Sequence, residues 1–361
     1  MIDTARERIF STFENWPGWL FNAPLVAWWF LLAARYGSLS LPTLANPKMP
    51  LGGLCGESKA GLLEELGPTG REHLAAYTLF TTHAAHDEAE VASAESAISK
   101  AGLAYPLIAK PDISRNGTGV QLVRSREDLG AYLASFPREE GLLFQRFIAE
   151  RGEAGVFYIR MPGEARGRIT SLTIKHFPSV EGDGRRTLKE LIEADPRAGQ
   201  LTHLYFPRFA ERLASVPAAG ERVPLVSVGN HVKGAVFEDG AAHITPAMEA
   251  RFDAIAQEIP EFRFGRFDVR YATLEGLKEG KGFWILEYNG VSSEPTHILA
   301  RDISLAKAYR DYCGAIAASF AIGAEYRRQG YRPAALAEIN RMQRNEWRLL
   351  ELYPQGKELE L

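Results

Sequence analysis

Hydrophobic and polar positions alternate along this chain in a way that predicts helices and strands in short groups. Apolar residues recur at helical spacing in the segments 57–66, 87–100, 126–135, 188–194, 246–259, 303–328 and 333–352. Shorter apolar or alternating runs predict strands at 38–44, 74–81, 105–110, 142–147, 155–178, 223–228, 234–237, 267–272 and 283–288. Because strands follow one another through tight turns, with helices between the groups, the pattern indicates an α+β fold with largely antiparallel sheets.

The segment 16–36 is the most apolar part of the chain and holds four of its six tryptophans. Its uninterrupted apolar stretch, 24–34, corresponds to about 16 Å of helix, against ~30 Å for the hydrocarbon core of a bilayer. We therefore expect a helix over 25–36 that does not span a membrane, with Pro24 in its first turn and Gly37 at its end. Two places stay open for this helix: peripheral contact with the membrane interface, where tryptophan is enriched, or a protein core or homodimer interface.

Composition excludes several classes of protein. With 361 residues, 46% of them hydrophobic and 24% charged, the chain is long enough for about two ordinary globular domains. Its 42 basic and 45 acidic residues give a net charge of −3, which argues against general nucleic-acid binding. Cys55 and Cys313 support neither a disulfide framework nor a cysteine metal site, and acidic residues precede the apolar segment where a secretory signal would be basic. We expect a cytoplasmic protein, with attachment to the inner membrane face as the alternative.

A candidate phosphate-binding loop follows the strand predicted at 105–110. Lys110 ends this strand, and Ser-Arg-Asn-Gly-Thr-Gly follows at 114–119. Asn-Gly between two apolar runs predicts a hairpin, and Gly117 and Gly119 would let backbone N–H groups approach phosphate oxygens beside the lysine. Taken alone, the pattern also fits an ordinary surface hairpin, because it matches neither the Walker A nor the dinucleotide-binding pattern.

Two later strands, one on each side of a turn at 275–280, carry a second group of polar residues. If they form a hairpin, Asp268 and Glu287 lie directly opposite each other. Arg266 and Asn289 then stand on the same sheet face. Facing carboxylates destabilise a sheet unless a cation separates them, and such oxygen ligands suit Mg²⁺ shared with substrate phosphates. The alternative is a network of ion pairs between these carboxylates and the neighbouring arginines.

The histidines are weaker candidates. His83 and His86 have a spacing that metal ligands can adopt, but they lead into an acidic segment typical of the solvated start of a helix. His176 and His231 are candidates for substrate contact, although satisfied structural histidines are the commoner case. The chain has no Gly-x-Ser-x-Gly or His-Glu-x-x-His sequence, which argues against the hydrolases that use them.

Taken in order, these segments resemble the ATP-grasp superfamily over roughly residues 57 to 300, and more closely its carboxylate–amine ligases, such as D-alanyl-D-alanine ligases and cyanophycin synthetases. Gly-Asp-Gly-Arg-Arg-Thr-Leu at 182–188 is similar to a stretch of the cyanophycin-type enzymes, and the strands of Asp268 and Glu287 resemble magnesium-binding strands. The resemblance implies two α+β subdomains that clasp ATP, with a shortened N-terminal domain and a C-terminal helical extension. The divisions it implies are a tryptophan-rich segment, a region before the core, two subdomains and a C-terminal helix, at 1–37, 38–56, 57–148, 149–325 and 326–361.

The resemblance also implies roles for individual residues. The nucleotide and phosphate contacts it implies are Lys59, Lys110, Ser114, Gly117, Gly119, Gln145, Phe147, Ile148, Glu153 and Lys175. The implied catalytic residues are Arg266, Lys110 and Lys175, and the implied magnesium ligands are Asp268, Glu287 and Asn289. Substrate contacts are expected at Ser292 and Ser293, with His231 as a further candidate. The chain departs from the family at Gln145, where glutamate is usual, and Glu150 competes with Glu153 for the ribose.

The function implied by the resemblance is an ATP-dependent ligase that joins a carboxylate to an amine through an acylphosphate, with Mg²⁺, and releases ADP and phosphate. The chemistry is plausible because a carboxylate is a poor electrophile until phosphorylation gives it a leaving group. The aromatic N-terminal segment adds the hypothesis that a substrate is lipid-linked, beside the small-molecule alternative. Two rival functions stay open, namely an ATP-grasp phosphotransferase acting on a hydroxyl and a non-catalytic nucleotide-binding module.

Overall fold

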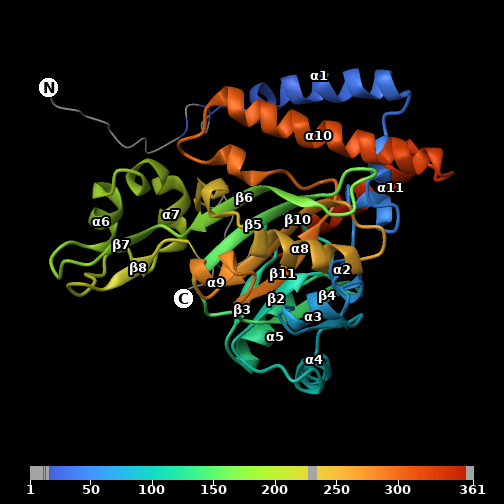
Figure 1. The fold of residues 1–361 in the computed structure, drawn as a ribbon. Helices are drawn as coiled ribbons and strands as arrows, with labels where there is room; N and C mark the ends of the chain where they lie inside the picture. Colours follow the sequence, from blue (N-terminus) through green and yellow to red (C-terminus); the bar gives the residue numbers. More distant parts are fainter. Residues whose placement is uncertain (1–10, 12, 14–15, 227–233, 355–361) are drawn as a thin grey trace, which may run out of the picture.

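A four-stranded sheet and a five-stranded sheet form the centre of the computed structural model, which describes residues 11, 13, 16–226 and 234–354 (Figure 1). Neighbouring strands in both sheets are antiparallel. Helices alternate with groups of strands along the chain and pack on the sheet faces, so the fold is α+β, as the hydrophobic pattern predicts. The strands of the two sheets fall within 57–148 and 149–325, while the domain boundaries themselves stay predictions.

The first sheet has the strand order β1-β4-β2-β3. Its strands are β1 (Tyr77–Thr81), β2 (Leu107–Pro111), β3 (Gln121–Val123) and β4 (Gly141–Arg146). Two helices, α4 (Glu88–Lys100) and α5 (Arg126–Ser135), pack against it. Each helix begins after a residue whose side chain accepts a hydrogen bond from a backbone N–H of the first turn. This residue is Asp87 for α4 and Ser125 for α5. Strands β2 and β3 pair antiparallel around the Asn-Gly turn, so the predicted hairpin is confirmed.

The second sheet has the strand order β11-β10-β5-β6-β9. Its strands are β5 (Gly152–Ile159), β6 (Arg168–His176), β9 (Val236–Asp239), β10 (Phe264–Tyr271) and β11 (Phe283–Asn289). One face, with Val156 and Phe267, packs on α8 (Pro246–Glu258) in an apolar core. Because successive side chains of a strand point to opposite faces, the other face is polar around Asp268 and apolar around Phe157. This division of one sheet face positions the site described below.

The N-terminal helix α1 (Gly18–Tyr36) packs along α10 (Leu305–Arg328), which lies between α1 and the second sheet (Figure 1). Leu25 and Leu32 are buried in this contact, and Trp28 Nε1 donates to the Cys313 carbonyl at 3.0 Å. One side of the helix therefore belongs to a core within the chain. The large apolar side chains that stay exposed on the helix are Trp19, Leu20, Val26, Phe30 and Leu31. None of the helices within the described ranges combines the length and the apolarity that crossing a bilayer requires.

Several predicted elements differ from those observed. The strand expected at 38–44 is replaced by the 3-10 helix η1 (Leu41–Leu44), which is buried against α10, and Pro42 in it has no N–H to donate to a sheet. The helix expected over 25–36 already begins at Gly18, with Pro24 in its interior. The helix expected over 57–66 is present as the shorter α2 (Lys59–Glu64), and an additional short helix, α3 (Pro68–Glu72), follows it.

The remaining elements complete the second half of the chain. A small lobe (left in Figure 1) holds α6 (Leu188–Ala194), η3 (Ala198–Leu201), α7 (Thr202–Arg208) and the paired strands β7 (Ser179–Glu181) and β8 (Arg222–Pro224). The strand expected at 223–228 is thus shorter in the structure, because β8 ends at Pro224 and residues 225 and 226 are not in a strand, while 227–233 lie outside the described residues. Shorter helices are η2 (Pro50–Gly52), η5 (Ala241–His243), α9 (Leu274–Lys278) and η6 (Thr296–Leu299).

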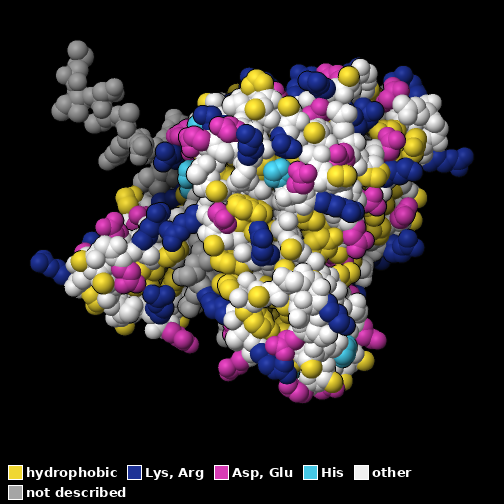
Figure 2. Space-filling model, turned by 60° about the horizontal axis from the view of Figure 1, so that its bottom comes forward, with side chains coloured by type: hydrophobic (Ala, Val, Ile, Leu, Met, Phe, Trp, Pro, Cys, Tyr) yellow, Lys and Arg dark blue, Asp and Glu magenta, His cyan; other side chains and the backbone are white. Residues whose placement is uncertain are grey.

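The last helix, α11 (Leu336–Leu352), returns the chain to the first sheet. Leu349 and Tyr353 are buried in the core of that sheet, and the Tyr353 ring stacks on Phe136 with ring centroids 5.4 Å apart. The C-terminal segment therefore contributes to the first half of the fold. On the face that Figure 2 presents, acidic and basic side chains are interspersed, in keeping with the small net charge.

A buried hydrogen bond between β5 and α8 provides a test of the second core. Tyr158 is fully buried, and its hydroxyl donates to Asp253 Oδ1 at 2.7 Å. Tyr158→Phe should lower the free energy of unfolding by about 1 kcal/mol, because Asp253 keeps its bonds from Gly167 N–H and Gln257. Chemical denaturation measures this loss. Tyr331→Phe, at a half-buried tyrosine, should change it by less than ~0.5 kcal/mol, and an equal loss in both variants would contradict the prediction.

Candidate active site

A cleft of about 470 Å³ lies between the two sheets. The predicted site residues that line it are Lys59, Lys110, Ser114, Gly117, Gln145, Phe147, Ile148, Glu153, Lys175, Arg266, Asp268, Glu287, Asn289, Ser292 and Ser293. Gly119 is not in its wall, and His231 lies outside the described residues. The structure thus gathers residues that are more than two hundred positions apart in sequence, from Lys59 to Ser293, and their roles stay predictions.

The paired strands β10 and β11 carry the acidic part of the cleft. Asp268 lies opposite Glu287, and Arg266 lies opposite Asn289, so the register predicted from the sequence is confirmed. The next pair joins Val269 to Ile285, which leaves residue 286 as an extra residue, a β-bulge. The connection between the strands contains the short helix α9 in place of a simple turn.

Asp268 is held by cations on both sides. Arg266 donates from Nη2 to Asp268 Oδ2 at 3.0 Å, and Lys175 Nζ donates to Asp268 Oδ1 at 2.8 Å. Burial by itself raises the pKa of Asp268, but the charges of Arg266 and Lys175 outweigh it and hold this pKa below its usual range. Lys175 also contacts Glu153 at 3.0 Å. Burial by itself lowers the pKa of Lys175, but the charges of Asp268 and Glu153 outweigh it. The pKa is therefore raised, and the lysine stays charged.

Glu287 differs from Asp268 in its contacts. Its side chain is half-buried in the cleft wall, and no described residue hydrogen-bonds or ion-pairs with its carboxylate. Asn289 donates from Nδ2 to Asp268 Oδ2 at 3.3 Å. Among the described residues, the Glu287 carboxylate therefore has no ion-pair partner, whereas Asp268 has two.

These residues fit a magnesium ion in their chemistry. Mg²⁺ is commonly held by one or two carboxylates together with water and substrate phosphates, rather than by a full cage of protein ligands. Among the described residues there is no cluster of three or more His, Cys, Asp or Glu side chains placed to hold a metal. Asp268, Glu287 and the amide of Asn289 would supply only part of a coordination sphere, as expected of a magnesium ion shared with phosphates.

Lys110, on β2, brings a positive charge to the opposite wall. Its Nζ donates to Gln145 Oε1 at 2.9 Å and to the Leu286 carbonyl at 3.2 Å. Gln145 Nε2 donates to the same carbonyl at 3.1 Å. Burial lowers the pKa of Lys110 to about 8, although the charge of Glu287 opposes that shift. Gln145, one of the predicted nucleotide contacts, thus accepts a hydrogen bond from this lysine.

The segment expected to contact adenine and ribose lies beside Arg270. The Ile148 carbonyl accepts a hydrogen bond from Arg270 Nη1 at 2.6 Å, and the Arg270 guanidinium lies over the Phe147 ring at 5.9 Å. Glu153 accepts from Arg270 Nε at 3.4 Å and lines the cleft, whereas Glu150 is not in its wall. Of the two glutamates considered for the ribose, only Glu153 lines the cleft, and its role stays a prediction.

The candidate phosphate loop is held at both ends in this structure. Lys59 Nζ donates to the Ser114 carbonyl and to Ser114 Oγ, so this lysine contacts the loop itself. Gly119 has a φ of +73°, and a Cβ there would lie 2.6 Å from Pro111, which only glycine avoids. The Gly119 carbonyl accepts from Tyr132, so this residue forms the base of the loop.

Among the residues that the sequence did not reveal are two acidic residues of the cleft wall, Glu346 and Glu57, and a glycine, Gly155, that lies next to Arg266 without lining the cleft. Glu346 of α11 lines the cleft and is only 5% exposed. Its Oε1 lies 3.7 Å from Arg115 Nε, and its Oε2 has no hydrogen-bond partner among the described residues. Burial raises the pKa of Glu57, as do the charges of Glu346 and Glu287. Helical spacing places Glu346 on the same face as Leu349, a signal that was available. Gly155 had no signal in the sequence, although a Cβ there would lie 3.1 Å from Arg266.

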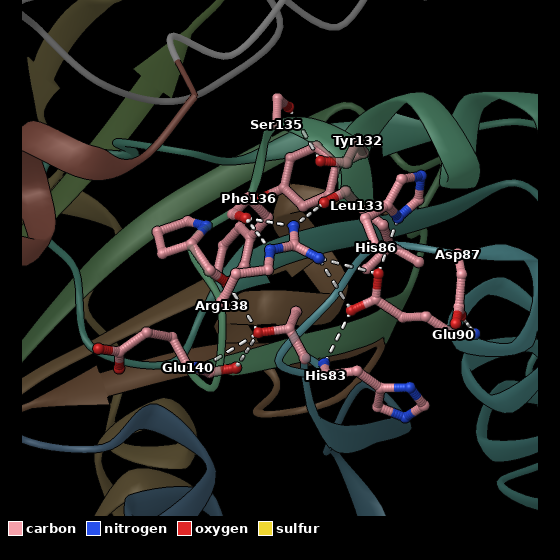
Figure 3. Close-up of polar contacts among 12 residues, drawn as sticks. His83, His86, Asp87, Glu90, Tyr132, Leu133, Ser135, Phe136, Arg138 and Glu140 are labelled. Atoms are coloured by element: carbon pink, nitrogen blue, oxygen red, sulfur yellow. Dashed lines mark hydrogen bonds and ion pairs between the residues drawn. The ribbon is translucent and has the colours of Figure 1, made fainter.

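Two histidines considered as metal ligands belong to a structural ion network instead. Glu90 is fully buried and accepts hydrogen bonds from His86 Nδ1 at 2.8 Å, from Arg138 and from the His83 backbone N–H. In Figure 3 the rings of His83 and His86 lie apart, with Glu90 between them. The segment is therefore the anchored start of α4, away from the cleft, rather than a fully solvated one.

Other motifs lie outside the cleft. Ser171 Oγ lies 2.6 Å from His297 Nδ1, and His297 Nε2 lies 2.9 Å from Asp311, but this buried chain does not line the cleft and ties η6 to β6 and α10. The stretch 182–188 forms part of the small lobe, where Thr187 caps α6. His176 is exposed and pairs with Glu238.

Comparisons with known proteins gave structural likenesses only. No protein family and no curated protein matched the sequence. Solved structures that resemble this one include a bifunctional glutathione synthetase from Pasteurella multocida, with 14% identity, a TM-score of 0.36 and coverage of 70% of this chain and 34% of that one. They also include the VanG D-Ala:D-Ser ligase from Enterococcus faecalis, with 13% identity, a TM-score of 0.38 and coverage of 75% and 62%. A RimK domain ATP-grasp protein from Sphaerobacter thermophilus has 12% identity, a TM-score of 0.37 and coverage of 74% and 67%.

This chain spans about a third of the glutathione synthetase and under two thirds of the D-Ala:D-Ser ligase. Identities this low and TM-scores below 0.5 say nothing about activity. The function has to be inferred from this chain's own residues.

Proposed function

We propose that this chain is an ATP-dependent ligase that joins a carboxylate to an amine, with ADP and phosphate as products. One observation carries the proposal: Asp268 and Glu287 face each other in register, and Lys110 from the other sheet enters the same cleft. Two facing carboxylates suit a divalent cation, and buried lysines suit the phosphates that such a cation accompanies. A cytoplasmic location and small-molecule or lipid-linked carboxylate and amine substrates are part of the same proposal.

The mechanism follows from charge and position. Asp268, Glu287 and Asn289 would hold Mg²⁺, which neutralises charge on phosphate oxygens when bound. Lys110 adds a positive charge from the first sheet, so phosphates in the cleft are held from two sides. Holding the substrate carboxylate in line with the terminal phosphate converts an encounter in solution into a step within one complex.

In this proposal, Arg266 stabilises the phosphorylated carboxylate. Its guanidinium is fixed by Asp268 and, through Nη1, by the Glu294 carbonyl at 3.1 Å, so its orientation is set before substrate arrives. In the proposed reaction, a carboxylate oxygen bonds to the terminal phosphorus and ADP leaves. The amine then attacks the carbonyl carbon of the acylphosphate, and phosphate leaves while the amine nitrogen loses its proton.

Hydroxylamine provides a test that does not require the natural amine to be known. Purified full-length chain is incubated with ATP, Mg²⁺, hydroxylamine and pools of carboxylic acids, and hydroxamates are measured with ferric iron. We expect hydroxamate formation in step with phosphate release. A stable phosphoester with no hydroxamate would favour phosphoryl transfer to a hydroxyl, and neither product with any pool would contradict catalysis.

An isotope measurement tests the acylphosphate itself. With the active acid labelled with ¹⁸O in its carboxylate, one labelled oxygen should appear in each released phosphate, because the carbonyl carbon keeps the other. Phosphate without label would contradict the proposed intermediate.

A further inference from the structure

A second cavity, of about 380 Å³, lies between α1, α10 and the second sheet. Its wall is mainly apolar, with Leu25, Val26, Trp29 and Phe30 from α1 and Ala315 and Ile316 from α10. Its volume falls within the range of about 300–1,000 Å³ that is usual for sites of small organic ligands. The cavity therefore has the size and the lining of a site for a hydrocarbon group.

This apolar cavity adjoins the polar cleft. Ser293 lines both of them. Phe264 lines the apolar cavity and precedes Arg266, a cleft residue, by two positions on β10. Val291 lines the apolar cavity and follows Asn289 by two positions. Two residues of a strand span roughly 7 Å, so the apolar wall begins about one side chain beyond the guanidinium of Arg266.

The groups at the boundary favour a negatively charged head on the ligand. Tyr312 lines the apolar cavity, and Glu294 lines the cleft. Burial, together with the charge of Glu294, raises the pKa of Tyr312, so its hydroxyl stays protonated. The cation nearest the boundary along the strand is Arg266, which suits a carboxylate.

Two side chains of α1 leave the cavity wall incomplete. Val26 is 51% exposed and Phe30 is 57% exposed, although both line the cavity. An apolar group that enters would remove this surface from water, which favours binding by about fourfold for each buried methylene.

We propose that the carboxylate substrate is amphiphilic, with its hydrocarbon chain in the cavity between α1 and α10 and its carboxylate at Arg266. This identification of the substrate class rests on the proposed ligase function for the reaction, but binding of the hydrocarbon chain can be measured without turnover. It also assigns α1 a role in binding substrate, beyond its packing on α10.

The test titrates the protein, with Mg²⁺ and ADP present, with straight-chain carboxylic acids from butanoate to tetradecanoate. Calorimetry measures the affinity for each acid below its micelle-forming concentration. We expect affinity to rise about fourfold per methylene and then to level off when the cavity is full. Phe30→Ala should weaken binding of the longer acids several-fold and leave butanoate unchanged. Leu31→Ala, at the neighbouring residue, which is 62% exposed and does not line the cavity, should leave the whole series unchanged.

Two outcomes would overturn the inference. Affinity that does not depend on chain length would exclude the cavity as a hydrocarbon site. Equal losses in Phe30→Ala and Leu31→Ala would show that the exposed helix face, rather than the cavity, attracts the acids. Both residues are on the surface of α1, and circular dichroism checks that both variants are folded.

The hydroxamate assay separates this inference from the proposed function. Chain-length-dependent binding without hydroxamate from any acid would contradict the ligase and support the cavity. Hydroxamate formation from short acids, with no gain in kcat/KM for longer ones, would support the ligase and overturn the cavity as a substrate site.

Discussion

Glu287→Gln should lower Mg²⁺-dependent ATP turnover by roughly a thousandfold while leaving the free energy of unfolding nearly unchanged. Glutamine has almost the same shape as glutamate but no charge, so it removes a metal ligand without creating a cavity. The fold should tolerate the change because no described residue ion-pairs with the Glu287 carboxylate. Phosphate release measured over a range of Mg²⁺ concentrations, together with chemical denaturation, checks both parts of the prediction.

Two further variants show whether the loss is specific to Glu287. Glu279→Gln makes the same chemical change at a surface residue between the two strands, which is 67% exposed, and should have no effect on turnover. Asp268→Asn should abolish turnover and also destabilise the fold by about 3–5 kcal/mol, because it weakens the pairing of two buried cations. Unchanged turnover in Glu287→Gln would remove this residue from the metal site.

Lys110→Met should lower kcat/KM for ATP by on the order of a hundredfold to a thousandfold, since it removes the cation that the first sheet supplies to the cleft. The wild-type kcat/KM should also fall as pH rises through about 8. Burial lowers the pKa of Lys110 to about 8, so the amine loses its proton, and its charge, above that pH. Initial rates at low ATP concentration across pH 6.5 to 10 measure this effect in the free enzyme.

Substitutions of the same lysine identify the source of the pH dependence. Lys110→Arg should move the alkaline fall to higher pH, because a guanidinium stays charged throughout this range. Lys100→Met, at an exposed lysine in the last turn of α4, should leave both rate and pH profile unchanged. An alkaline fall that persists unchanged in Lys110→Met or Lys110→Arg would mean that another group causes it.

Local signals explain which parts of the fold could be predicted from the sequence. The helices at 126–135 and 188–194 have the predicted bounds because Ser125 and Thr187 cap them, and caps are visible in sequence. The pairing of Asp268 with Glu287 was also predictable, because the strands are joined by a short connection whose midpoint fixes the register.

The parts that escaped prediction depend on contacts between distant segments. Residues 38–44 have the apolar character of a buried strand, but in the structure they contain a 3-10 helix that is buried against α10. Lys175 lies on β6 and Asp268 on β10, and their side chains meet across β5, which lies between these two strands. No local signal in the sequence predicts this strand order. The two cavities depend likewise on how α1, α10 and α11 return to the sheets.

The extra residue in β11 has a mechanical consequence for the cleft. The carbonyl of Leu286, the extra residue itself, accepts hydrogen bonds from both Lys110 and Gln145 of the first sheet, so this one oxygen links the two sheets twice. A phosphate that draws the Lys110 ammonium to itself would leave Gln145 as the remaining donor to that oxygen. Nucleotide entry would thus remove one of the two hydrogen bonds that this carbonyl accepts, while the backbone hydrogen bonds of Ile285 with His73 and Ala75 would still join the two halves.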